Sequence, residues 1–295
     1  MNRHESIHCM TGRRPRLMAA TLALPVAMWL ITAGTARAQQ KHRLNPLIEK
    51  LEAGGNALTP DDWTFIDLEH GPFSIDRLQS ILDDLGKKRK ANGQLPSAPI
   101  VRIPMDGDES SRWVVKQALD SGAMGIIFGH VESKEQALAA VQSMRYPPQK
   151  GAAHPAPLGK RGYAPQRAVR YWGVPLMEYL HRADVWPLNP DGELFAMIMI
   201  ETVEGVKHIN DILDVPGIGA IFIGASDLGM SLGVGPANPL PPPETEAAIQ
   251  TVLKACKAKQ VLCAFPAIGG PSEVKMRLEQ GFRMLLVAGT PRQNP

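Results

Sequence analysis

The sequence is poor in cysteine, with three among 295 residues. Cys9 lies in a leader-like segment, which leaves Cys256 and Cys263 for the folded part of the chain. These two could pair in an oxidising compartment, but two separate buried thiols are the favoured interpretation, because unpaired cysteine is commonly a core residue. Histidine and cysteine nowhere cluster with the ligand spacing of a zinc site, so a dedicated zinc site is not expected.

Long apolar runs are absent except at the start of the chain. There, an arginine-rich stretch (residues 13–16) precedes an apolar run (residues 17–33), and a small-residue Ala-Arg-Ala sequence (residues 36–38) follows. This three-part pattern is typical of a secretory signal peptide, and its apolar core is short for a membrane span. We therefore expect cleavage near Ala38, a secreted or periplasmic mature protein, and no membrane association after cleavage.

Positive charge is not in excess once this leader is removed. Residues 1–38 contain five Lys+Arg and one Asp+Glu, so the counts of 32 and 29 fall to 27 and 28, and the formal charge changes from +3 to −1. A nearly neutral chain lacks the excess of positive charge that attracts nucleic acid or an acidic membrane surface, so neither partner is expected. The remaining 257 residues (295 − 38) suit a single α/β domain.

The chain also lacks the G-x-G-x-x-G turn expected after an early strand of a dinucleotide-binding sheet. What is present is a regular alternation of helices with strands that are apolar along their full length, which indicates a parallel sheet buried on both faces. Helices are expected over residues 46–53, 75–85, 113–121, 134–144, 244–259 and 272–280. Strands are expected from residue 63 and over 99–104, 124–130, 194–200, 218–223, 261–265 and 283–288. The sequence therefore predicts an α/β fold of the TIM (β/α)8-barrel type for residues 39–295.

A long segment rich in proline and glycine, residues 146–193, interrupts this alternation, with one helix-like stretch over residues 175–183. A segment of this length in a compact domain usually forms a lid or an interface arm, and a plain surface insertion is the alternative. Because it follows the third recognised strand, we expect it to leave from the barrel face that carries the site. Its cations and aromatic residues, with Trp172 and Trp186 among them, favour contact with a neighbouring subunit and hence a homo-oligomer.

The most informative stretch runs from Trp63 to Pro72, where an apolar strand ends in Asp67, Glu69 and His70. Asp67 and Glu69 share one parity, so both side chains should point to one side of the strand, with Leu68 on the other. Catalytic groups collect where a rigid strand meets a loop. The alternative is a solvated strand end that caps the following helix.

Charged residues also close later strands: Arg102, Glu201 and Asp227. The carboxyl ends of barrel strands meet at one face, so these residues are expected to lie together with the carboxylates and histidine of the opening strand. Glu201 and Asp227 are hard oxygen donors that suit Mg²⁺ or Mn²⁺. Arg102 can stabilise an oxyanion or an enolate.

His70, oriented by Asp67 or Glu69, is a candidate general acid or base that titrates near neutrality. A metal, a fixed cation and a base together suit proton abstraction beside a carbonyl, or its reversal by carbon–carbon cleavage. The alternative is a set of buried ion pairs, since barrel ends carry such networks without function.

Six ordered stretches resemble the HpcH/HpaI aldolase family, the metal-dependent class II pyruvate aldolases typified by 4-hydroxy-2-oxoheptanedioate aldolase. They are FIDLEHGP (65–72), VRIP (101–104), VKQALDSG (115–122), RYPP (145–148), IET (200–202) and FIGASDL (222–228). The resemblance extends from about Trp63 to Ala288. It implies a carbon–carbon lyase on a phosphoenolpyruvate/pyruvate-type barrel, acting on a small-molecule 2-oxo acid and an aldehyde.

The resemblance also implies the residues of the site. They are Glu201 and Asp227 for a divalent metal (Mg²⁺, Mn²⁺ or Co²⁺); His70, Arg102 and Asp67 for catalysis; and Arg102, Glu69, Gly224, Ala225 and Ser226 for substrate contact. The metal would chelate a pyruvate-type 2-oxo acid, Arg102 would stabilise the enolate oxygen, and His70 with Asp67 would handle the proton. The reaction would be aldol or retro-aldol cleavage of a 4-hydroxy-2-oxo acid.

The sequence departs from the family pattern in three places. Met199 stands where the family usually carries Gln, which removes a polar contact near the substrate. The family's first strand and helix fit poorly into residues 53–62, and the chain stops at Pro295, where the family continues into a final helix. A barrel that lacks the first strand and helix and the last helix is therefore an alternative. The corresponding rival function is an aldolase-like barrel that binds a metal and a 2-oxo acid in the periplasm without full turnover.

Overall fold

The computed structural model describes residues 42–104 and 112–289. The expected signal peptide, residues 1–38, lies outside the described residues and stays a prediction. Within the described residues, no helix combines the length and the apolar character that crossing a membrane requires.

Eight parallel strands form the predicted barrel. Their order is β1-β9-β8-β7-β6-β4-β3-β2, and a further strand, β5, pairs with β6. The strands are β1 (Ala57–Leu58), β2 (Trp63–Asp67), β3 (Ala98–Arg102), β4 (Gly125–Phe128), β5 (Val185–Trp186), β6 (Leu194–Ile200), β7 (Ala220–Ile223), β8 (Leu262–Ala267) and β9 (Met284–Val287). In the described residues no ladder joins β1 to β2, so the barrel is nearly closed rather than closed.

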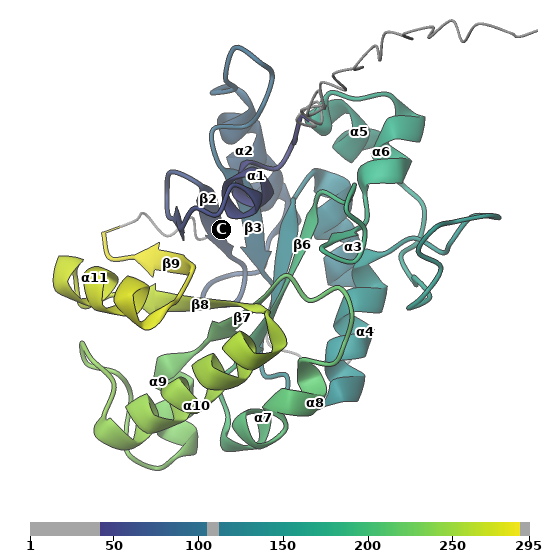
Figure 1. Ribbon diagram of the computed structural model, residues 1–295. Coiled ribbons are helices and arrows are strands. Elements are labelled where there is room, and N and C mark those ends of the chain that lie inside the picture. Colours follow the sequence, from purple (N-terminus) through teal and green to yellow (C-terminus); the bar gives the residue numbers. More distant parts are fainter. Residues whose placement is uncertain (1–41, 105–111, 290–295) are drawn as a thin grey trace, which may run out of the picture. The chain divides into compact units, whose positions relative to one another are not determined.

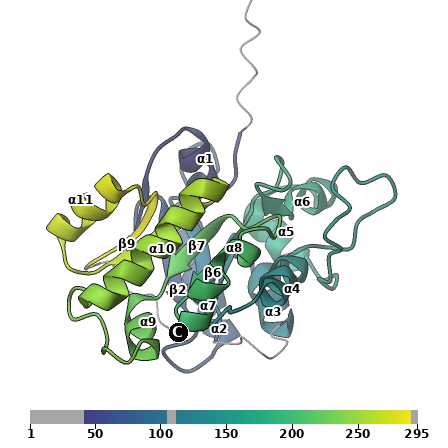
Figure 2. The ribbon, with the colours of Figure 1, turned by 60° about the horizontal axis from the view of Figure 1, so that its bottom comes forward.

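From β2 onwards helices alternate with the strands and pack on their outer side, whereas α1 packs against the barrel interior. The helices are α1 (Pro46–Glu52), α2 (Ile75–Gly86), α3 (Arg112–Ser121), α4 (Lys134–Met144), α5 (Gln166–Trp172), α6 (Leu176–Arg182), α7 (Val203–Lys207), α8 (Ile209–Ile212), α9 (Ala225–Ser231), α10 (Pro243–Lys259) and α11 (Pro271–Gln280). Local sequence sets their ends: Ser74 caps α2, and Ser133 forms a capping box with Gln136 at the start of α4. Figures 1 and 2 both show α3 and α4 on one side of the strands and α10 and α11 on the other.

The strands bury both faces, and alternate residues divide between two cores. The outward residues pack under the helices, whereas the inward residues fill the barrel together with Leu47, Ile48 and Leu51 of α1. Inward residues include Trp63, Phe65, Ile100, Ile127, Phe195, Met197, Met199 and Phe222. Because side chains alternate along a strand, this parity also directs Asp67, Arg102 and Glu201 inward at the carboxyl ends of β2, β3 and β6.

The start of the barrel corrects one expectation. The first strand is not missing: β1 is present, and Ala57 and Leu58 pair with Met284 and Leu285 of β9. It is short, and only residues 59–62 connect it to β2, so the described residues contain no helix between these two strands. The described residues end shortly after β9, and the expectation about a final helix lies outside them.

The long segment between α4 and β6 is better ordered than expected, since it contains α5, α6 and β5. It begins at the carboxyl end of α4 and ends at the amino end of β6. It therefore lies at the amino-terminal end of the strands, and the expectation that it leaves from the face that carries the site is wrong. Figure 1 shows α5 and α6 at the upper right, whereas α7 and α9, which follow β6 and β7, lie at the bottom.

The two tryptophans of this segment pack against their own chain. Trp172 is buried, donates its Nε1–H to the carbonyl of Gly122 at 3.1 Å, and meets the Tyr179 ring edge-on at 4.8 Å. Trp186 stacks on Phe195 at 5.8 Å between ring centroids. The interpretation that Trp172 faces a neighbouring subunit is therefore wrong, whereas for the half-buried Trp186 it stays a prediction, as does the homo-oligomer.

The two cysteines of the folded part are buried and unpaired. Cys256 lies in α10 and Cys263 in β8. Burial, with the thiol's hydrogen bond to Cys256, raises the pKa of Cys263. Both residues are therefore separate buried thiols, as the sequence analysis favoured.

Replacing Trp172 with Ala is expected to destabilise the protein by about 3–5 kcal/mol, because it removes a large buried side chain and a buried hydrogen bond. Chemical denaturation would measure this change. The matched control is Trp113→Ala in α3, whose side chain is 58% exposed, and which should change the free energy of unfolding by less than about 0.5 kcal/mol. Equal effects of the two substitutions would contradict the packing described above.

Candidate active site

Asp67 lies at the centre of the site and is fully buried at the end of β2. Its carboxylate accepts hydrogen bonds from both Nε (3.0 Å) and Nη2 of Arg102, and from the backbone amides of Glu69 (3.0 Å) and His70 (3.3 Å). Burial alone would raise the pKa of the Asp67 carboxyl, but the hydrogen bonds and charge of Arg102 outweigh burial and lower this pKa. Asp67 is therefore ionised, and it shapes the turn that carries Glu69 and His70. Leu68 packs in the outer core, as its opposite parity predicted.

Arg102, at the end of β3, is held from several sides. Besides its two bonds to Asp67, its Nη1 lies 2.9 Å from Glu69 Oε2. Its guanidinium also lies over the Phe65 ring, 5.2 Å from the ring centroid. These contacts fix a buried cation in one orientation before any substrate arrives.

His70 is the exposed member of this group, with a side chain that is 56% exposed. Its Nδ1 lies 3.2 Å from Asp67 Oδ2 and 3.7 Å from Glu69 Oε2, and it also contacts Nη2 of Arg102. A protonated Nδ1 donates to Asp67, whereas a bare Nδ1 accepts from Arg102, so either state of the ring has a partner. The structure thus brings together the base, the orienting carboxylate and the cation that the sequence analysis selected.

Glu201 faces this group from the end of β6 and is also buried. Its Oε1 accepts a hydrogen bond of 2.8 Å from the backbone amide of His130. Burial, together with the negative charges of Asp227 and Glu69, raises the pKa of the Glu201 carboxyl to about 7, even though the His130 amide and Arg102 oppose this rise. Unlike the ionised form of Asp67, the ionised form of Glu201 is therefore disfavoured, because its surroundings do not balance a negative charge there.

Asp227 lies in the first turn of α9, directly after β7, and is exposed. Gly224 precedes this helix, and a side chain at position 224 would run into the Glu201 carboxylate. Ala225 is buried and Ser226 is half-buried at the same turn. The turn from Gly224 to Asp227 therefore lies beside Glu201, as predicted for a single site.

Two sets of residues could hold a metal ion. Among the described residues, one group of three has ligand atoms within 4.8 Å of one another: Asp67, Glu69 and His70. Arg102 already binds both carboxylates of this group, so a cation there would compete with a fixed positive charge. Among the described residues, no Lys or Arg forms an ion pair with Glu201 or Asp227, and their mutual repulsion is one cause of the raised pKa of Glu201. We conclude that the predicted pair, two hard oxygen donors, fits a divalent cation better.

The sequence analysis missed His130. This residue follows β4, adopts a left-handed backbone conformation (φ 51°), and places its ring Nε2 3.8 Å from Glu201 Oε1. The signal was available, because the expected strand over residues 124–130 ends in this histidine just as the opening strand ends in His70. Only a match to the family motifs was lacking.

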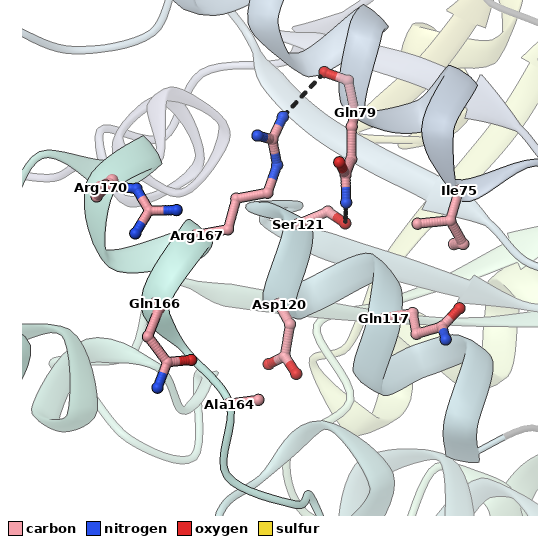
Figure 3. A pocket seen from close by; sticks show the side chains of 9 residues that line it. All are labelled: Ile75, Gln79, Gln117, Asp120, Ser121, Ala164, Gln166, Arg167 and Arg170. Atoms are coloured by element: carbon pink, nitrogen blue, oxygen red, sulfur yellow. Dashed lines mark hydrogen bonds between the residues drawn. The ribbon is translucent and has the colours of Figure 1, made fainter.

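Concave surfaces elsewhere do not share these residues. One pocket lies between α2, α3 and α5, where Arg167 donates to the carbonyl of Gln79 at 3.3 Å and Gln79 donates to Ser121 at 3.2 Å (Figure 3). These polar groups bond one another and tie the helices together. A larger groove of about 880 Å³ lies between residues 145–163 and α6, at the other end of the barrel. Neither contains a predicted site residue.

Comparison with known proteins agrees with this geometry. The family model of HpcH/HpaI aldolase/citrate lyase matches residues 50–284. The hydroxypyruvate/pyruvate aldolase of Paraburkholderia phytofirmans is 30% identical over 229 residues, which cover 77% of this chain and 78% of the relative. The 4-hydroxy-2-oxo-heptane-1,7-dioate aldolase of Klebsiella pneumoniae is 35% identical over 205 residues, which cover 69% and 67%.

Solved structures show the same fold. An HpcH/HpaI aldolase from Desulfitobacterium hafniense superposes with a TM-score of 0.66 at 25% identity, over 82% of this chain and 89% of that one. An HpcH/HpaI aldolase/citrate lyase family protein from Burkholderia cenocepacia gives a TM-score of 0.61 at 29% identity, over 77% and 79%. The chain therefore belongs to the HpcH/HpaI aldolase/citrate lyase family, as its motifs predicted, and is an enzyme of the carbon–carbon lyase class.

Proposed function

We propose that this protein is a metal-dependent aldolase that cleaves 4-hydroxy-2-oxo acids to a pyruvate-type 2-oxo acid and an aldehyde, and catalyses the reverse addition. The observation that carries this proposal is that two groups of side chains with different charge environments lie at one end of the barrel. One is the balanced group of Asp67, Arg102 and His70, and the other is the unbalanced pair of Glu201 and Asp227. The names of the similar aldolases support the same substrate class.

Glu201 and Asp227 would hold the divalent ion, for which Mg²⁺, Mn²⁺ and Co²⁺ are all candidates. When bound, the ion supplies a Lewis acid that polarises the carbonyl of the 2-oxo acid. Gly224 leaves room for the Glu201 carboxylate to take part. Ala225 and Ser226, at the adjacent turn, and Glu69, on the opposite side, are placed to contact the substrate.

Arg102 would stabilise the oxygen that becomes negative when the carbon–carbon bond breaks. Its orientation is set in advance by Asp67 and Glu69, so little reorganisation is needed during the reaction. Because Asp67 and Glu69 both bind the Arg102 guanidinium, the guanidinium can move only a short way towards the substrate. We therefore assign Arg102 to charge stabilisation rather than to proton transfer, since arginine does not deprotonate in proteins.

His70 would move the proton between the substrate hydroxyl and solvent. Asp67 holds the ring through Nδ1, and the exposed side chain can exchange protons with water. We further propose that the mature protein acts outside the cytoplasm, as its leader sequence predicts, and that it works as a homo-oligomer.

One observation favours the rival function, a barrel that binds a metal and a 2-oxo acid without full turnover. Met199, which stands where the family usually carries Gln, is buried in the barrel interior two residues before Glu201. The floor of the site is therefore apolar at this point. A measurement of turnover separates the two functions. An aldolase needs an intact His70 for proton transfer, whereas a protein that only binds metal and 2-oxo acid does not.

A retro-aldol assay tests the proposed function. The purified mature chain is expected to release pyruvate from 4-hydroxy-2-oxo acids when Mg²⁺, Mn²⁺ or Co²⁺ is added, and to lose this activity in chelator. Glu201→Ala and Asp227→Ala should abolish both metal-dependent activity and thermal stabilisation by metal. Glu204→Ala, at an exposed carboxylate in α7, is the matched control. Metal binding that survives both site substitutions would contradict the assignment of ligands.

The raised pKa of Glu201 predicts how metal-free stability depends on pH. The folded pKa of about 7 lies above the model value of 4.5, so the ionised form is disfavoured in the folded state. The stability contribution is therefore complete below pH 4.5 and is lost as the pH rises through 7. By this shift, Glu201→Gln should gain up to roughly 3 kcal/mol over the parent at pH 8 and little at pH 4.5. Denaturation in chelator at both pH values measures the difference, and a gain independent of pH would contradict it.

Arg102→Lys is expected to fail although it keeps the positive charge. A lysine cannot bridge Asp67 and Glu69 in a planar fork, so the loss of turnover should be about as severe as in Arg102→Ala. His70→Ala should reduce kcat by about 10²–10⁴-fold with little change in metal affinity. Steady-state kinetics and metal titration of the three variants provide the measurement. Near-normal turnover in Arg102→Lys would remove Arg102 from charge stabilisation.

A further inference from the structure

A positively charged pocket lies where the end of α2 meets α5, at the end of the barrel opposite to the candidate active site. Its volume is about 420 Å³, and the charged side chains that line it are Asp83, Lys87, Arg89, Arg167 and Arg170. Four cations and one carboxylate give this lining a formal charge of +3, whereas residues 39–295 as a whole carry −1. Positive charge is therefore concentrated at one concave surface of a nearly neutral chain.

Close packing brings cations of two separate segments to this pocket. The Tyr171 ring of α5 lies beside Gly86, the last residue of α2, where an added Cβ atom would come within 3.2 Å of the ring. Arg167 reaches from α5 to α2 and donates to the Gln79 carbonyl at 3.3 Å (Figure 3). The arginines of α5 thus adjoin the basic run that follows α2, residues 87–90.

Arg89 is half-buried and has no carboxylate partner among residues 42–104 and 112–289. Its Nη1 donates to the Gly93 carbonyl at 2.6 Å and its Nη2 to the Tyr171 carbonyl, and both of these acceptors are neutral. The guanidinium also lies over the Tyr171 ring, 5.4 Å from the ring centroid. These contacts hold the side chain in place without cancelling its charge. A fixed positive charge at the wall of a pocket favours an anion there.

The other three cations are balanced only in part. Arg170 is exposed and forms no hydrogen bond or ion pair within the part of the chain that the structure describes. Lys87 pairs with Asp84 at 2.8 Å, but these side chains are 74% and 70% exposed, and such surface pairs contribute little. Arg167 pairs with Asp83, the carboxylate of the lining. The lining therefore carries more positive charge than its own carboxylate offsets.

A simpler interpretation is that the basic run only completes α2, because cations at the carboxyl end of a helix interact favourably with its dipole. That effect concerns the helix to which the cations belong. It does not account for Arg170, which comes from α5, or for the contacts of Arg89 with Tyr171, which fasten the run to α5. A ligand that both segments bind explains a charged pocket built from the two of them.

We propose that this pocket binds the phosphate group of a small molecule. A phosphate monoester carries about −1.5 to −2 charges near pH 7 and three acceptor oxygens, so it can bind guanidinium and ammonium groups of both segments at once. A carboxylate brings a single negative charge and would leave most of the lining unbalanced. The volume of about 420 Å³ also leaves room for the organic part of the ligand. The pocket shares no residue with the candidate active site, so this proposal does not depend on the proposed function.

The test is isothermal titration calorimetry of the metal-free mature chain with inorganic phosphate at low ionic strength. The parent should bind phosphate at least about tenfold more tightly than acetate, because the dianion can engage more of the cations. Arg170→Gln and Lys87→Gln remove exposed cations, which limits misfolding. Each should weaken phosphate binding about threefold or more, and the double variant about tenfold or more. The matched control is Lys275→Gln in α11, whose side chain is 80% exposed, and which should match the parent.

Lipid headgroups are another source of phosphate, so a second arm measures binding to phosphatidylcholine vesicles with and without phosphatidylglycerol. We expect no preference for the anionic vesicles. Three results would overturn the proposal: phosphate affinity that the double variant retains, equal affinity for phosphate and acetate, or binding to anionic vesicles without binding of inorganic phosphate. Failure of the proposed function is a separate result, because it would abolish pyruvate release in the parent, whereas Arg170→Gln and Lys87→Gln should leave that activity unchanged.

Discussion

The pairing of Asp67 with Arg102 is the interaction on which the site depends. The two residues are partners in the register of β2 and β3, so the parallel ladder places their side chains together at the same end of the barrel. Asp67 then has two kinds of donor: the guanidinium across the ladder and the backbone amides of the next turn. One buried carboxylate thus fixes a cation, a turn and the position of a histidine. Loss of Asp67 would leave a buried Arg102 without its main partner, which is costly in a protein interior.

Charge is distributed unevenly across the end of the barrel. On the β2–β3 side, Arg102 binds both Asp67 and Glu69, whereas on the β6–β7 side Glu201 and Asp227 repel each other. The barrel interior below both sides is apolar, and Met199 extends it to the base of Glu201. An apolar floor strengthens the electrostatic contrast between the two sides because it excludes water from beneath them. When both Glu201 and Asp227 are ionised, a bound cation stabilises the pair. Without a cation, their repulsion destabilises the folded protein.

The barrel could be predicted from sequence because its elements are strongly patterned. The six expected helices each begin and end within one residue of the structure, and apolar runs such as residues 194–200 match their strands. The short helices α7, α8 and α9 escaped notice because five, four and seven residues are too few to show a helical period. The strand β1 is too short, at two residues, to show an apolar pattern in the sequence. Its register with β9 is set by the folded barrel and not by its own residues.

The candidate site was predictable where a charged residue ends an apolar strand. Asp67, Arg102 and Glu201 stand out on this criterion, because a charged residue at the end of a buried strand is uncommon unless it belongs to a site or an ion-pair network. His130 also follows an apolar strand, but unlike His70 it lies outside the family motifs and has no carboxylate beside it in sequence, so it was not selected. Residues 146–193 were misplaced for another reason: the order of elements shows what a segment follows, but its end of the barrel depends on whether it leaves a strand or a helix. Here it leaves α4.

The missing ladder between β1 and β2 has a consequence for the motions of the site. Within the described residues, β2 and β1 each pair with a neighbouring strand on one side only, so the strand that carries Asp67 is one of two edge strands at the seam of the barrel. Edge strands open locally at lower free-energy cost than central ones. The side-chain bonds between Asp67 and Arg102 therefore reinforce the attachment of this edge strand to β3. Local opening of β2 would displace the residues that Asp67 holds, whereas Glu201 lies on β6, which is paired on both sides.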